Sequence, residues 1–158
     1  MVCRGSIPLI PTMNIEKSFD KAFERMRERN WEKIYVLVDI HDTIFEACYH
    51  NTEEFKWYPH AKEALQIMSY SRNICLILWS SSHRETLKEI YGKVFDENHI
   101  KFDYININPE TKNNDLSCFD EKTYFNVGID DKFGFDAETD WETVHDYLVE
   151  AIRLGKFK

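Results

Sequence analysis

Apolar residues recur every three or four positions in several segments of the chain, and charged residues fill the positions between them. This spacing places apolar side chains on one face of a helix. It predicts helices over residues 15–29 and 141–152, and shorter helices around residues 61–68 and 87–91. Pro59 precedes the 61–68 segment, as expected for a proline near a helix start.

Between these segments lie short runs that are continuously apolar. Residues 34–38 and 74–79 are unbroken runs of this kind, and shorter strands are expected at 102–107 and 124–129. Such continuity is typical of strands buried on both faces, as in a parallel sheet. Because strands alternate with helices, the sequence predicts an open, Rossmann-like α/β fold with a mostly parallel sheet and helices on both faces.

The length of 158 residues indicates one domain, which we expect to span residues 14–158. Residues 1–13 contain two prolines and no periodicity, so they are expected to form a flexible leader. Translation from Met1 and translation from Met13 are both compatible with this pattern.

The chain carries 20 basic and 28 acidic residues, a formal net charge of −8. This balance argues against a general nucleic-acid binder, which needs a basic surface, although it leaves room for a local basic pocket. No run approaches the roughly 20 apolar residues of a membrane span, and the N-terminal sequence lacks the apolar core of a signal peptide. The four cysteines form no CxxC pair. We therefore expect a cytoplasmic protein with reduced thiols and no membrane partner.

Polar residues gather where the predicted strands end. The strand exits read Asp39-Ile40-His41-Asp42-Thr43, Ser80-Ser81-Ser82, Asn106-Ile107-Asn108 and Asp130-Asp131. Open α/β sheets bind ligands beyond the carboxyl ends of their strands. Two strand ends that carry Asp make an oxygen site suited to Mg²⁺, and a carboxylate beside that ion can attack phosphorus. Taken singly, Asp and Ser are also common in turns and helix N-caps.

In this order, the strand exits resemble the motifs of the haloacid dehalogenase (HAD) superfamily. The segment from Asp39 to Thr43 is similar to motif I, DxDxT, and Leu78-Trp79-Ser80 is similar to motif II. The run that ends in Asp130-Asp131 is similar to motif IV. Lys112 lies upstream of the last strand, where the motif III Lys usually occurs, and Lys122 is the alternative.

This resemblance implies an HAD-like phosphatase that depends on Mg²⁺ and acts through an aspartyl-phosphate intermediate on a phosphomonoester. Asp39 would be the nucleophile. The implied phosphate contacts are Thr43, Ser80, Ser81 and Lys112, and the implied metal ligands are Asp39, Asp130, Asp131 and the backbone carbonyl of His41.

His41 departs from the family pattern, because phosphatases of this superfamily carry a second Asp at that position. Three interpretations follow. His41 replaces that Asp as general acid and base, a task for which imidazole is well suited. Alternatively, the acid/base function is lost and the phosphoryl-enzyme hydrolyses slowly. In the third interpretation, the protein binds a phosphorylated ligand or partner without turnover.

The spacing between the motifs leaves no room for a sizeable cap domain, so the cleft is expected to be open to small or macromolecular phosphorylated substrates. The aromatic segment 55–58 is expected to pack onto the following helix rather than to form a short flap. A structural protein of flavodoxin-like architecture is a third class, but it leaves the placement of Asp39, Ser80 and Asp130 to coincidence.

Overall fold

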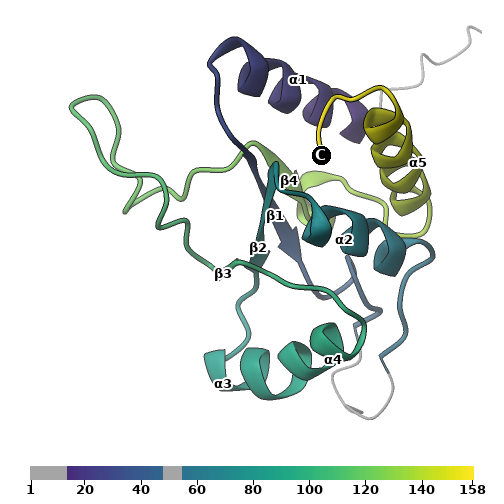
Figure 1. The fold of residues 1–158 in the computed structure, drawn as a ribbon. Helices are drawn as coiled ribbons and strands as arrows, with labels where there is room; N and C mark the ends of the chain where they lie inside the picture. The colour runs from purple at the N-terminus through teal and green to yellow at the C-terminus, as the bar shows by residue number, and fades with distance from the viewer. Residues whose placement is uncertain (1–13, 48–54) are drawn as a thin grey trace, which may run out of the picture.

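The computed structural model describes residues 14–47 and 55–158, and its centre is a four-stranded parallel sheet (Figure 1). The strands are β1 (Ile34–Asp39), β2 (Ile74–Trp79), β3 (Tyr104–Ile105) and β4 (Val127–Ile129). Their order across the sheet is β3-β2-β1-β4. The predicted α/β fold with a parallel sheet is confirmed, and the described residues form no cap domain.

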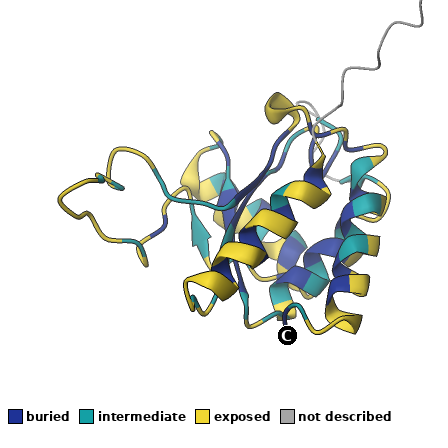
Figure 2. Ribbon diagram, turned by 90° about the horizontal axis from the view of Figure 1, so that it is seen from above, coloured by how far each residue is buried: buried dark blue, intermediate teal, exposed yellow. Residues whose placement is uncertain are grey.

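Three helices build the main core on one side of the sheet: α1 (Ile15–Glu28), α2 (Ala61–Tyr70) and α5 (Asp140–Arg153). Their apolar faces are buried and their charged faces exposed, as Figure 2 shows by colour. Asn14 begins α1, and its side chain accepts a hydrogen bond from the Lys17 amide. These three helices lie within two residues of the segments that the apolar spacing predicts.

The helical segment after β2 is less regular than predicted. It consists of α3 (Arg84–Thr86), a π-helical turn η1 (Leu87–Tyr91) and α4 (Gly92–Glu97). Leu87, Tyr91 and Phe95 point into the same main core. A short 3₁₀ turn, η2 (Asp131–Phe133), follows β4.

β3 is shorter than the predicted strand 102–107. Asn106 adopts a left-handed backbone conformation with φ of 57°, which ends the pairing after Ile105. On the other side of β3, the Asp103 carboxylate accepts a hydrogen bond from the Leu76 amide. The strand is therefore limited at one end by a side-chain bond to β2 and at the other by the turn at Asn106, whose side chain bonds to Ser80 just after β2.

The opposite face of the sheet carries a smaller cluster made of Leu37, Cys75 and Ile77. The partly buried residues around it are Tyr35, Trp79, Tyr104 and Phe125, so within the described chain no helical residue belongs to this cluster. The helical cover of the two faces is thus unequal. The long connection from β3 to β4 projects from the body of the protein on this side (Figure 1).

Among the described residues, no helix is long and apolar enough to cross a membrane. The prediction of a leader at residues 1–13 lies outside the described part of the chain.

Candidate functional site

Three carboxylates meet at the carboxyl edge of the sheet. β1 pairs with β4 so that Val38 lies opposite Ile129, and the next residues, Asp39 and Asp130, therefore end neighbouring strands side by side. Oxygen atoms of Asp39, Asp130 and Asp131 all lie within 4.8 Å of one another. The structure thus brings together the three aspartates that the sequence predicted as metal ligands.

Thr43 links the ends of β1 and β4. Its side chain is fully buried, donates a hydrogen bond to Asp39 Oδ2 (3.3 Å) and accepts one from the Asp131 amide (3.2 Å). The Thr43 carbonyl accepts a further bond from the buried indole Nε1 of Trp141, at 2.7 Å. The hydroxyl predicted to contact phosphate therefore joins the acidic residues to each other in this structure.

The electrostatics of this cluster favour a bound cation. Burial raises the pKa of Asp39 to about 6, and the charges of Asp130 and Asp131 act in the same direction. Burial and the adjacent Asp130 also raise the pKa of Asp131. None of the ion pairs formed by the described residues involves these three carboxylates. Three oxygen ligands that lack a protein cation fit a hard divalent ion such as Mg²⁺.

His41 is partly buried, and its ring contacts Tyr91. Its Nε2 atom lies 2.7 Å from the Tyr91 hydroxyl, and the two rings meet edge to face. The rings of Phe45 and Phe55 contact Tyr91. The aromatic segment 55–58 was predicted to pack onto the following helix; Lys62 of α2 lies over the Trp57 ring, 5.1 Å from its centroid, whereas Phe55 packs against η1. The role of the His41 backbone carbonyl as a metal ligand stays a prediction.

Ser80 follows β2 at the same edge of the sheet and is clamped by Asn106. The Ser80 amide donates to Asn106 Oδ1 (2.8 Å), and Asn106 Nδ2 donates to the Ser80 carbonyl (2.7 Å). The Ser80 hydroxyl accepts a bond from the Ser82 amide, whereas Ser81 is exposed. The two serines that were predicted together thus have different environments.

Replacing Asn106 with Ala is expected to destabilise the protein by about 1–2 kcal/mol, because both bonds to Ser80 are lost. Replacing it with Gly removes the same bonds but relieves the left-handed backbone at φ 57°, so this variant should be more stable than the Ala variant by about 1 kcal/mol. Urea unfolding of the three proteins measures both differences. Equal stability of the Ala and Gly variants would contradict this account of the turn.

The structure does not bring Lys112 to the acidic cluster. Lys112 is exposed and lines a cavity of about 900 Å³ with Lys33 and Tyr35, which lie at the amino end of β1. Asp39 closes the opposite end of that strand. Lys122, the alternative, is also exposed, and among the described residues neither lysine side chain forms an ion pair.

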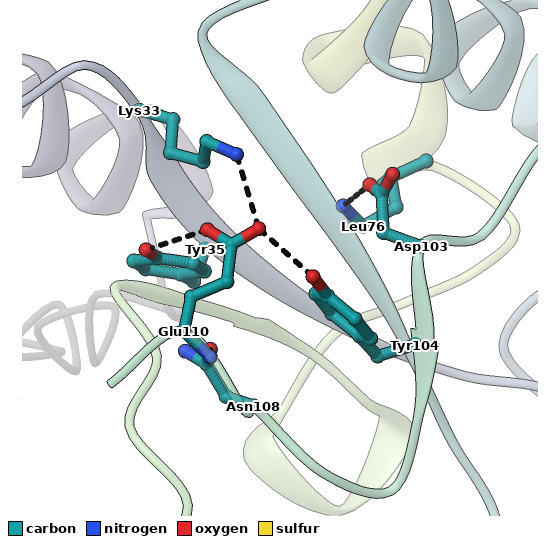
Figure 3. A network of polar contacts seen from close by, with 7 residues as sticks. All are labelled: Lys33, Tyr35, Leu76, Asp103, Tyr104, Asn108 and Glu110. Carbon is teal, nitrogen blue, oxygen red and sulfur yellow. Dashed lines mark hydrogen bonds and ion pairs between the residues drawn. The ribbon is translucent and has the colours of Figure 1, made fainter. Parts of the chain in front are cut away.

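Glu110 fixes the path of the chain that leads to Lys112. Its carboxylate accepts hydrogen bonds from Lys33 Nζ (3.1 Å), the Tyr35 hydroxyl (2.9 Å) and the Tyr104 hydroxyl (2.9 Å), as Figure 3 shows. Asn108 supports the turn by bonding to the Glu110 amide. This network fastens the chain after β3 across the second face of the sheet, so that the following residues lie toward the amino end of β1.

Three residues around the site were not predicted as functional. Asn106 lies at a predicted strand exit, and that position alone could have identified it as a candidate site residue. Tyr91 and Trp141 occupy positions on the apolar faces of predicted helices, and this pattern predicts only that they are buried. Their polar atoms reach the site from distant segments, and no local pattern indicates that.

Comparisons of this chain with models of protein families, with curated proteins and with solved structures found no match.

Proposed function

We propose that this protein is a small Mg²⁺-dependent phosphohydrolase that acts on a phosphomonoester through an aspartyl-phosphate on Asp39. The observation that carries the proposal is the convergence of Asp39, Asp130 and Asp131 within 4.8 Å at the carboxyl ends of adjacent parallel strands. The ordered similarity of the strand exits to HAD motifs supports the same reaction class.

Asp39, Asp130 and Asp131 would hold the metal ion, whose positive charge offsets that of the carboxylates and of the substrate phosphoryl group. Asp39 is the best-placed nucleophile, since it ends a central strand and its Oδ2 atom is oriented by the Thr43 hydroxyl. Two bonds from the Asn106 side chain hold the Ser80 backbone, which carries the Ser80 hydroxyl, at the same edge of the sheet.

The reaction then takes two steps. An Asp39 oxygen attacks phosphorus, the P–O bond to the alcohol breaks, and the leaving oxygen takes a proton from the protonated His41 ring. In the second step His41 takes a proton from water as the water oxygen attacks phosphorus. The P–O bond to Asp39 breaks, which releases inorganic phosphate and restores the carboxylate.

Hydrolysis of 4-nitrophenyl phosphate tests this function. The wild type is expected to be active with Mg²⁺ and inactive with EDTA, and Asp39→Asn should be inactive. His41→Ala should lower kcat by about 10²–10⁴-fold, the usual cost of losing a general acid/base. Absence of Mg²⁺-dependent activity in the wild type would contradict the proposal.

A second candidate function is binding of a phosphorylated ligand without turnover. The position of Lys112, away from the acidic cluster, favours it, because this lysine does not supply the charge that phosphoryl transfer needs there. In that case the wild type binds inorganic phosphate in the presence of Mg²⁺ but does not hydrolyse the ester, and His41→Asp gains activity. Calorimetric titration with phosphate separates the two candidates.

A further inference from the structure

We propose that Tyr91 is the positioning residue of His41 and holds the imidazole ring in one orientation. The catalytic consequence of this proposal rests on the proposed function, in which His41 is the general acid and base. The contact itself can be tested without any enzymatic activity.

The first support is the geometry of the pair. Tyr91 Oη lies 2.7 Å from His41 Nε2, a distance typical of a well-formed hydrogen bond. The ring planes are nearly perpendicular, at 88°, with centroids 5.6 Å apart. A hydroxyl can donate to an imidazole nitrogen or accept from its N–H, so this bond holds the ring in either tautomer. The Tyr91 hydroxyl therefore acts on the orientation of the His41 ring.

The second support is that Tyr91 is itself held firmly. Tyr91 is only 9% exposed, and its ring packs against those of Phe55 and Phe45, with centroid distances of 5.3 Å and 6.1 Å. Aromatic rings at these distances attract each other beyond the effect of burial alone. A hydroxyl on such a fixed ring is a rigid partner for His41.

The third support is the backbone that carries Tyr91. It is the last residue of the π-helical turn η1, and the Gly92 amide that follows donates to the Leu87 carbonyl. A π-turn contains one more residue than an α-turn, so it shifts the face that the following side chains occupy, and such turns are frequent at functional sites. Here the irregular turn ends on the residue that contacts His41.

Two tyrosine variants test the proposal. Tyr91→Phe removes the hydroxyl and keeps the ring. Tyr147→Phe is the matched control, because the Tyr147 hydroxyl also makes a 2.7 Å bond, to Asp20, between α1 and α5. The kinetic constants of each are measured with 4-nitrophenyl phosphate and Mg²⁺, in the wild-type and His41→Ala backgrounds.

Tyr91→Phe is expected to lower kcat about tenfold with KM changed less than about twofold, since a mispositioned group costs rate rather than binding. In the His41→Ala background the same change should have no further effect. Tyr147→Phe should leave kcat unchanged. A kcat for Tyr91→Phe equal to that of Tyr147→Phe, or an equal loss in both backgrounds, would overturn the positioning role.

Nitrogen-15 NMR of the histidine rings separates failure of this proposal from failure of the proposed function. The wild type should show the His41 Nε2 resonance shifted by its hydrogen bond to the Tyr91 hydroxyl, and Tyr91→Phe should lose this shift. If the wild type shows no Mg²⁺-dependent hydrolysis, the proposed function fails, and the spectra alone decide the positioning role. The same Nε2 chemical shift in both proteins would then overturn it.

Discussion

Replacing Asp39 with Asn is expected to abolish phosphate-ester hydrolysis and, at the same time, to stabilise the metal-free protein at neutral pH. Burial and two neighbouring carboxylates raise the pKa of Asp39 from 3.8 to about 6. The folded protein thus holds this proton more tightly than the unfolded chain does. The stability that Asp39 contributes is complete below about pH 4 and is lost as the pH rises through about 6.

Asn has the same shape and no charge, so it avoids this loss. The expected gain near pH 7 is about 1–2 kcal/mol, which allows for the solvent that still reaches this half-buried side chain. Urea unfolding in EDTA at several pH values measures it. The two proteins should converge near pH 4, and Mg²⁺ should stabilise only the wild type.

The control for this experiment is Asp96→Asn, because Asp96 is an exposed residue of α4. This variant should not be stabilised relative to the wild type. A wild-type protein as stable as Asp39→Asn in EDTA at pH 7 would show that the acidic cluster stores no unfavourable charge, and the main electrostatic argument for a cation there would fail.

The largest loss of stability is expected for Trp141→Ala, at about 3–5 kcal/mol. Trp141 is fully buried in α5, packs edge-on against Phe135, and donates its indole hydrogen to the Thr43 carbonyl. The variant leaves a cavity and an unpaired carbonyl beneath the site. Urea unfolding in EDTA gives the change in the free energy of unfolding.

Trp141→Phe separates these two effects, because it keeps most of the ring volume and removes the N–H donor. It should cost about 1–3 kcal/mol, the usual penalty for a buried group left without its partner. Tyr70→Ala, at a side chain that is 73% exposed on α2, should change stability by no more than about 0.5 kcal/mol. A similar small effect for Trp141→Ala would contradict the packing described for α5.

Most of the fold could be predicted because the signals are local. The buried runs at 34–39 and 74–79 and the helical spacing of α1 and α5 depend only on neighbouring residues. The errors lie where side chains from other segments intervene. Asp103 shortens β3 through a bond to β2, and Asn106 does so through bonds to Ser80 just after β2. The π-turn at 87–91 positions Tyr91, which the apolar spacing describes only as buried.

The same distinction applies to the site. The sequence by itself determined that Asp39 and Asp130 would meet, because parallel strands end at one edge of a sheet and both residues follow buried runs. Only the tertiary structure decided what surrounds them. Tyr91 reaches His41 from 50 positions away and Trp141 reaches Thr43 from 98. Bonds from Tyr35 of β1 and Tyr104 of β3 to Glu110 hold the start of the loop that carries Lys112. These contacts depend on the path of each loop and on the packing of each helix, which local patterns do not encode.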